Sequence, residues 1–277
     1  KTAYEIKECD WSSDVCSSDL ERFRREHGCE FLIYDETLIN PTTLIEMAGI
    51  DPIERQGQVR WYSRPSANHT YVVALDPSMG TGGDSAAIQV IEVPGMRQIG
   101  EWQHNKTPIQ QQVRILQAIT QHIYDSIGTE TDIYYSVENN TLGEAALVTI
   151  AEIGEENIRG IFLSEPAKMG TGRKYRKGFN TTNKTKLAVC AKFKALIEGN
   201  KLQLASKPLI SQLKTFVASG SSYEAKPGEH DDLVSACLLI CRMAAVLADW
   251  DPEIYDSVSD RLEDESLPMP IYISSYF

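Results

Sequence analysis

The middle of the chain alternates between apolar runs of strand length and segments in which apolar residues recur every three or four positions. The strand-like runs are residues 71–75, 86–93, 97–103, 132–137 and 158–163. The first run, YVVAL, is apolar throughout, which is typical of a strand that is buried on both faces. The helical patterns cover residues 107–127, 142–153, 183–199, 208–216 and 231–248. Together they predict an α/β domain whose mixed sheet is flanked by helices.

The two ends of the chain differ from this body. Residues 1–20 contain DWSSDVCSSDL, which resembles the translation of a common sequencing adapter, so we expect a non-native segment there; the alternative is a polar N-terminal linker. Residues 21–69 form a connector, in which the sequence NPTT at residues 40–43 predicts a turn followed by a helix start. Residues 70–248 hold the predicted α/β domain, and residues 249–277 form an acidic C-terminal tail.

The composition excludes several classes of protein. Hydrophobic residues make up 42% and charged residues 24% of the 277, which is ordinary for a soluble globular chain. No apolar run approaches the roughly eighteen residues of a transmembrane helix, and the first residues lack the apolar core of a secretory signal, so no membrane partner is expected. The six cysteines form no CxxC pair, which favours reduced thiols over disulfides or zinc.

Charge is unevenly distributed along the chain. The formal net charge of −12 argues against a protein that is basic overall and coats nucleic acid. Residues 168–201 nevertheless hold ten Lys or Arg and one acid, whereas residues 249–265 hold eight acids and one Arg. A local basic strip of this kind can bind phosphate although the chain as a whole is acidic. The alternative is a solvated, charged loop.

Acidic residues stand where predicted elements end or begin. Asp76 follows the first buried strand, and Glu138 follows the strand over residues 132–137. The pair Asp231 and Asp232 opens the last helix. Carboxylates at such positions can converge on one cleft, where Mg²⁺ or Mn²⁺ relieves their repulsion, and two ions about 3.5–4 Å apart suit displacement at a phosphodiester. Each acid also has a structural alternative, as a turn former or a helix start.

The loop that follows Asp76, SMGTGGD, is rich in glycine. It is neither a Walker A motif nor a Rossmann loop, and it predicts a tight turn whose backbone comes close to a ligand or metal. Asp84 is a candidate further ligand, although a turn cap is the simpler role. His230 precedes the acidic pair and is a candidate partner for phosphate or a hydrolytic water, and Asn139 is a candidate for supporting Glu138.

Four segments resemble a known family. They are LDPSMGTGGDSAAIQVIEV, YYSVENNTLGEAALVTI, GFNTTNKTKLAVCAKFKALIEGNKLQL and SYEAKPGEHDDLVSACLLI, and they resemble the nuclease domain of the large terminase subunit of tailed bacteriophages. The resemblance runs from about Glu21 to about Ala248, and VENN followed by Gly, together with GEHDDLV, is its most specific part. It implies an RNase H-like fold and metal-dependent cutting of concatemeric double-stranded DNA during genome packaging, with two Mg²⁺ or Mn²⁺ ions as cofactors.

The resemblance also implies roles for individual residues. The acidic triad falls on Asp76, Glu138 and one of the Asp231–Asp232 pair. Neighbours on a helix point about 100° apart, and Asp232 stands four residues before Ala236 on the core face, whereas Asp231 stands four before Ser235 on a more polar line. We therefore expect Asp232 to bind metal and Asp231 to lie behind it or near the DNA. The basic strip would contact the DNA backbone through Lys168, Arg173, Lys174, Arg176, Lys177, Lys184 and Lys186.

Partners follow from the same resemblance. In the family an ATPase domain with a Walker A motif comes first; this sequence has no such motif, and residues 21–44 resemble only the end of that domain. The implied partners are the portal, the small terminase subunit and the ATPase domain, in the cytoplasm of an infected bacterial host. Two other interpretations stay open. One is an actin-like ATPase or sugar kinase, for which a second Gly-rich phosphate loop is missing, and the other is a non-catalytic packaging component that binds DNA or the portal.

Overall fold

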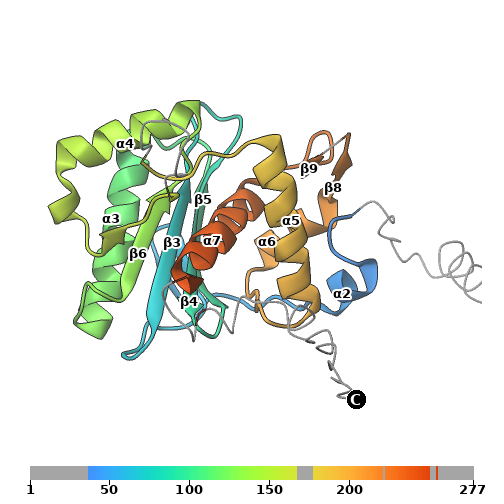
Figure 1. Cartoon of the computed structure of the whole chain (residues 1–277), viewed down its shortest axis with the longest axis horizontal. Coiled ribbons are helices and arrows are strands. Elements are labelled where there is room, and N and C mark those ends of the chain that lie inside the picture. Colours follow the sequence, from blue (N-terminus) through green and yellow to red (C-terminus); the bar gives the residue numbers. More distant parts are fainter. Residues whose placement is uncertain (1–36, 167–176, 221, 250–253, 255–277) are drawn as a thin grey trace, which may run out of the picture. The chain divides into compact units, whose positions relative to one another are not determined.

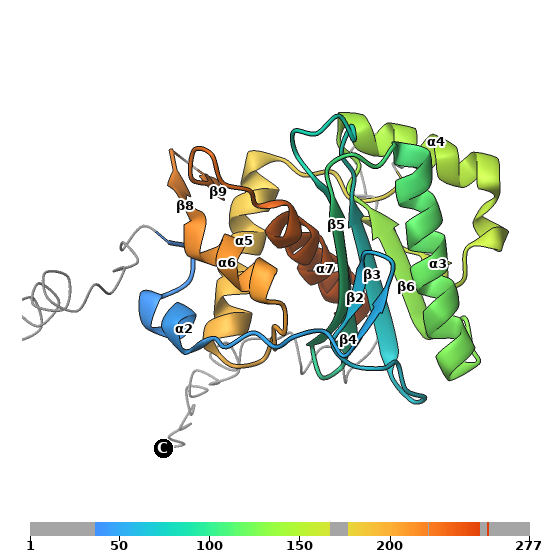
Figure 2. The ribbon, with the colours of Figure 1, turned by 180° about the vertical axis from the view of Figure 1, so that it is seen from behind.

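The computed structural model describes residues 37–166, 177–220, 222–249 and 254, and their centre is a mixed seven-stranded sheet (Figures 1 and 2). The strand order is β1-β2-β5-β4-β3-β6-β7. In chain order the strands are β1 (Glu54–Gln56), β2 (Val59–Trp61), β3 (Thr70–Asp76), β4 (Ala86–Val93), β5 (Arg97–His104), β6 (Ile133–Val137) and β7 (Ile161–Phe162). Neighbouring strands from β1 to β3 run antiparallel, whereas β3, β6 and β7 run parallel to one another.

Helices cover both faces of the sheet (Figures 1 and 2). On one face, α3 (Ile109–Ile127) and α4 (Thr141–Ile153) lie against β6, and α3 also touches β3. On the other face, α7 (Asp232–Ala248) packs against β3 and β4, and α5 (Asn183–Glu198) and α6 (Lys207–Thr215) pack on α7. The remaining elements are short: α2 (Pro41–Glu46), the 3-10 turn η1 (Glu155–Asn157), and the hairpin of β8 (Phe216–Ser219) and β9 (Ser222–Ala225).

The core lies where the apolar faces of these elements meet. Every residue of β4 is buried, and β3 is buried from Tyr71 to Leu75, as expected of central strands that are covered on both faces. Helix α3 turns Val113, Leu116 and Ile119 towards the sheet. Helix α7 is apolar almost all round because the sheet covers one side of it and α5 and α6 cover the other.

The structure confirms the predicted α/β architecture, and most predicted boundaries lie within two residues of the observed ones. The strand expected over residues 158–163 is an exception, because only Ile161–Phe162 is paired. Gly160 precedes this strand with a φ of +107°, a backbone conformation that interrupts extended structure. The strands β1, β2, β8 and β9 have only three or four residues each, and the sequence pattern does not predict them.

Parts of the connector and three of the cysteines lie within the described residues. Helix α2 begins at Pro41, and the Asn40 side chain accepts a hydrogen bond from the Thr42 amide, which confirms the predicted turn and helix start. The free thiols of the described cysteines are all buried: Cys190, Cys237 and Cys241. In the described part of the chain, no helix is long and apolar enough to cross a membrane. The adapter-like segment and most of the acidic tail lie outside the described residues, so the domain boundaries stay predictions.

Candidate metal centre

The parallel pairing of β3 and β6 brings two of the predicted acids together. Leu75 is the register partner of Val137, so Asp76 and Glu138 are the next residues along at the same edge of the sheet. The amide of Glu138 donates to the carbonyl of Leu75 at 3.0 Å, which adds a ladder bond beyond the last residue of β6. Because neighbouring strands lie about 4.8 Å apart, the two carboxylates start from adjacent positions.

The first turn of α7 faces the same edge, since α7 packs against β3 and β4. Asp231 is the N-cap residue of α7, but its side chain makes no capping hydrogen bond. The amide of Leu233 donates instead to Oε1 of Gln212 on α6, at 2.9 Å. A neighbouring helix therefore satisfies a backbone amide that an N-cap aspartate usually satisfies.

The two neighbouring aspartates point in different directions. Asp232 is only 8% exposed, and its Oδ2 accepts a hydrogen bond from Nε2 of Gln103 on β5 at 3.1 Å. Asp231 is more exposed, and its Oδ2 lies 3.8 Å from Nζ of Lys186 on α5. This divergence is what successive residues at the start of a helix produce. Asp232 lies deeper, and Asp231 is turned towards a lysine.

A cavity of about 550 Å³ opens between these elements. The acids Asp76, Glu138, Asp231 and Asp232 all line it, and Asp84 lines it from the glycine-rich loop after β3. Apolar side chains of α5 and α7 also line the cavity, so the carboxylates lie beside apolar as well as polar groups.

Burial and neighbouring carboxylates raise the pKa of two of these acids, Asp76 and Asp232. Burial and the adjacent carboxylate of Glu138 raise the pKa of Asp76 well above its ordinary range, and the charges of Asp232 and Asp231 add to the effect. Burial also raises the pKa of Asp232, against the hydrogen bond from Gln103, which lowers it. In the absence of a cation, folding therefore brings together carboxylates that repel one another.

A hard divalent cation fits this donor set. All the converging ligand atoms are carboxylate oxygens, which Mg²⁺ and Mn²⁺ prefer, and a cation relieves the repulsion that raises the pKa of Asp76. Among residues 37–166, 177–220 and 222–249, no three His, Cys, Asp or Glu side chains already form a metal cage. The acids thus meet as the adjacent pair Asp76 and Glu138, with Asp232 in the wall of the same cavity.

Residues 73–244 match the sequence profile of the Terminase RNaseH-like domain family. The chain belongs to this family. The matched region spans β3 to α7 and thus includes Asp76, Glu138, Asp231 and Asp232. The family membership confirms the resemblance to terminase nuclease domains that the sequence segments indicated.

Solved structures of terminase nucleases share the fold. The large terminase nuclease from thermophilic phage G20c with bound magnesium is 16% identical, with a TM-score of 0.55 over 75% of this chain and 97% of that chain. The same nuclease with bound cobalt gives a TM-score of 0.54 at 16% identity over 75% and 97% of the two chains. The nuclease domain of the Thermus phage P74-26 large terminase gives 0.50 at 16% identity over 72% and 92%. These matches confirm the RNase H-like fold of the terminase domain described here.

The candidate supporting residues of this terminase domain have unequal positions. Asp84 is exposed and lines the cavity. His230 is mostly exposed, with its Nδ1 3.9 Å from Oδ2 of Asp232. The side-chain Nδ2 of Asn139 donates to the carbonyl of Lys177 at 2.8 Å, so this side chain holds a neighbouring segment.

The basic strip is only partly described. Lys168, Arg173, Lys174 and Arg176 lie outside the described residues, so their role stays a prediction. Lys177 pairs with Glu155, Lys184 is exposed on α5, and Lys186 lines the cavity. Of these described lysines, Lys186 is therefore the one placed beside the acids.

Sequence reasoning missed side chains that shape the cavity from behind. Gln112 of α3 is fully buried; it donates to the carbonyls of Ser78 and Thr107 at 2.8 and 2.7 Å and accepts from the Ser78 amide at 3.3 Å. It thus holds the loop that follows Asp76. One signal in the sequence could have identified Gln112: it is a polar residue next to Val113, on the apolar side of a predicted helix. A polar side chain that is buried in this way is expected to form hydrogen bonds.

Proposed function

We propose that this cavity is the active centre of a metal-dependent endonuclease that cuts double-stranded DNA. The observation that carries the proposal is the meeting of Asp76, Glu138 and Asp232, from three separate elements, around one cavity in a terminase RNase H-like domain. The magnesium-bound and cobalt-bound structures of the related phage nuclease support a divalent cation as the cofactor.

Asp76, Glu138 and Asp232 would hold the metal, and two Mg²⁺ or Mn²⁺ ions bound there supply an activated water and stabilise the charge on the leaving oxygen. Asp76 stands beside Glu138 and is also coupled electrostatically to Asp232, so it is the residue best placed to serve both ions. Gln103 orients Asp232 through a neutral amide, which leaves the negative charge of the carboxylate available for a cation.

Lysines of α5 would bind the DNA backbone. Lys186 lines the cavity, and Lys184 is exposed two residues earlier on the same helix, outside the cavity wall. Cationic side chains that contact phosphates position DNA without reading its sequence, so we expect weak sequence preference. Asp231 pairs with Lys186 and would therefore lie close to the bound DNA.

The biological substrate that we infer is concatemeric viral DNA, cut during genome packaging in the cytoplasm of an infected bacterial host. The portal, the small terminase subunit and a packaging ATPase domain are the partners that this role requires. The family match favours this role over an actin-like ATPase or sugar kinase. A cleavage assay tests the remaining alternative, a non-catalytic packaging component, because such a protein would bind DNA without cutting it.

The decisive experiment measures nicking of supercoiled plasmid DNA with Mn²⁺, with and without a chelator. We expect metal-dependent cutting, lost in Asp76→Asn, Glu138→Gln and Asp232→Asn. Asp51→Asn is the matched control, because Asp51 is 85% exposed and pairs with Lys207 away from the cavity. DNA binding without any cutting by the wild-type chain would contradict the nuclease proposal, and ATP turnover without DNA cleavage would favour the kinase alternative.

A further inference from the structure

The backbone of Glu138 is held on two sides by different kinds of neighbour. On one side, its amide bonds to Leu75 on β3. On the other side, β7 has already ended, and a non-strand segment takes its place: the Phe179 amide donates to Val137 at 3.2 Å, and the Asn139 amide donates to Phe179 at 2.7 Å. The position of Glu138 therefore depends on a segment that lacks the support of a regular sheet.

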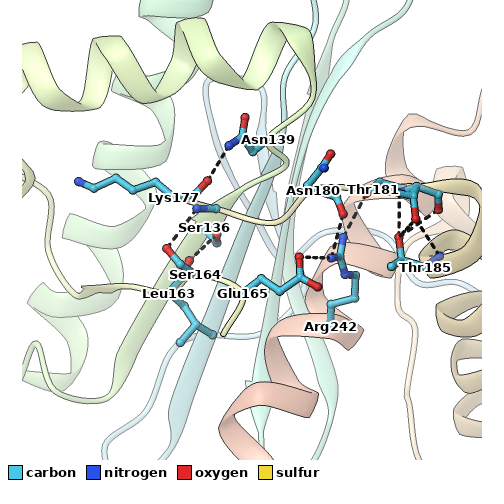
Figure 3. A network of polar contacts seen from close by, with 12 residues as sticks. Ser136, Asn139, Leu163, Ser164, Glu165, Lys177, Asn180, Thr181, Thr185 and Arg242 are labelled. Atoms are coloured by element: carbon cyan, nitrogen blue, oxygen red, sulfur yellow. Dashed lines mark hydrogen bonds and ion pairs between the residues drawn. The ribbon is translucent and has the colours of Figure 1, made fainter. Parts of the chain in front are cut away.

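Arg242 of α7 fastens that segment (Figure 3). Its Nη2 donates to the carbonyl of Asn180 at 3.1 Å, and its Nη1 donates to Oγ1 of Thr181 at 3.2 Å. Its guanidinium carbon lies 5.1 Å from the ring centroid of Phe179, and its charge pairs with Glu165 at 3.1 Å. One side chain, 11% exposed, thus contacts three consecutive residues of the segment.

Glu165 ties the same segment a second time. Its amide donates to the carbonyl of Gly178 at 3.1 Å, and the Gly178 amide donates to Oγ of Ser164 at 3.1 Å. Gly178 has a φ of +75°, and a Cβ there would lie 2.6 Å from the carbonyl of Val137. The segment therefore packs closely against the end of β6. Glu165 and Arg242, which form an ion pair, bind it at Gly178 and at Asn180 respectively.

The geometry points to Arg242 as a positioning residue for Glu138, which sets the place of this carboxylate in the cavity by locking residues 179–181 between the end of β6 and α7. Because α7 also begins with Asp232, the same side chain links the helix of one metal-binding acid to the segment that borders the other. The inference rests on the proposed nuclease function and names a residue outside its acidic set.

Arginine is suited to this task for a geometric reason. The guanidinium presents donors in a planar fork, so it can reach a carboxylate, a backbone carbonyl and a hydroxyl at once while its face lies over a ring. A lysine keeps the charge but offers a single nitrogen, which cannot make these contacts together. Arg242→Lys therefore separates positioning from charge, which matters because Arg242 also lines the cavity and could otherwise act on phosphate directly.

The test compares wild type, Arg242→Lys and the matched control Arg159→Lys. Arg159 makes the same kinds of contact, with Glu130, with Oε1 of Gln121 and over the ring of Tyr124, but outside the cavity. Three quantities are measured: the Mn²⁺ concentration that gives half-maximal plasmid cutting, the KM for DNA, and the Mn²⁺-induced rise in Tm without DNA.

We expect Arg242→Lys to raise the half-maximal Mn²⁺ concentration about 10- to 100-fold, the usual effect of removing an outer support of a metal site. The Mn²⁺-induced rise in Tm should shrink in parallel, and the KM for DNA should stay unchanged. Arg159→Lys should remain within about twofold of wild type, since exposed ion pairs contribute little. An unchanged metal dependence in Arg242→Lys, or a raised KM for DNA without a change in metal dependence, would overturn the inference.

Hydrogen exchange in a chelator tests the positioning itself. Loss of the guanidinium fork should speed exchange at the Asn139 amide, which bonds to Phe179, while the amides of β4 in the same sample keep their protection. Unchanged exchange at Asn139 would contradict the inference even if folding is slightly weakened. A wild-type chain that neither cuts DNA nor gains Tm from Mn²⁺ would remove the proposed function, and the exchange result would still decide whether Arg242 fastens the segment.

Discussion

Gly143 offers a direct way to displace Glu138 without touching its side chain. It lies in the first turn of α4, buried against the backbone of Glu138. A Cβ at this position would lie 1.9 Å from the carbonyl oxygen of Glu138 and 2.8 Å from its carbonyl carbon. Real Cβ atoms essentially never come closer than 3.0 Å to such atoms, so Gly143→Ala must separate the two backbones by about 1 Å.

The expected cost of Gly143→Ala is larger in activity than in stability. Misplacement of a reacting group by about 1 Å can reduce a rate on the order of 100-fold. In an unstrained helix the change from Gly to Ala would stabilise by about 1 kcal/mol, whereas overpacking costs about 1–3 kcal/mol, so the net loss should be at most about 2 kcal/mol. For a domain of this size that loss lowers Tm by roughly 4–8 °C.

The assay is Mn²⁺-dependent plasmid nicking, with Tm measured in a chelator on the same preparations. Gly95→Ala is the matched control, because Gly95 is exposed between β4 and β5, lies outside the cavity wall, has no left-handed φ, and leaves a Cβ only ordinary contacts of 3.8 Å or more. We expect the control to cut at a rate within about twofold of wild type, as for a surface substitution. Wild-type cutting by Gly143→Ala would refute the reasoning, since Glu138 would then tolerate displacement or would not take part.

Three further predictions concern the acids and the loop beside them. Because the folded pKa of Asp76 is raised, the free energy of unfolding of metal-free protein should fall as pH rises above about 4, and Asp76→Asn should flatten that fall in urea titrations between about pH 4 and 8. Asp232→Asn should abolish plasmid cutting with its circular dichroism unchanged, and the opposite result, loss in Asp231→Asn alone, would reverse the assignment of the metal ligand. Gln112→Leu should leave buried groups of Ser78 unsatisfied, and calorimetry should give a Tm lower by several degrees, for a loss of about 1–3 kcal/mol; an unchanged Tm would contradict this role.

The pattern of apolar residues predicts most of the fold because the central strands and helices are strongly apolar. The run YVVAL and the helix over residues 232–248 have too few polar positions to be anything but buried. The strands β1 and β2 are different: they have three residues each, include charged side chains, and form one end of the sheet, with β1 as its edge strand. Short edge strands owe their pairing to tertiary contacts, which leave no periodic signal in the sequence.

Only those residues of the candidate site that directly follow or begin a predicted strand or helix could be predicted from the sequence. Asp76 and Glu138 could be named because they follow apolar runs, but their adjacency depends on the parallel pairing of β3 with β6, which no local pattern specifies. The supports Gln103 and Gln112 come from elements distant in sequence. Arg242 left a clue, as the only basic residue in an otherwise apolar helix, but its partners Asn180 and Thr181 lie some sixty residues earlier.

The way α7 begins separates two tasks that helix starts usually combine. The carboxylate of an N-cap aspartate normally accepts hydrogen bonds from the first amides of its own helix, so replacing that aspartate destabilises the first turn. Here Gln212, reaching across from α6, accepts from the Leu233 amide, and Asp231 is free to face Lys186. The start of α7 is thus stabilised by a residue of α6, while the aspartates at that start face the cavity. Asp231→Asn should therefore cost little in folding, whereas Gln212, which is not part of the cavity wall, is the residue whose loss should fray the first turn of α7.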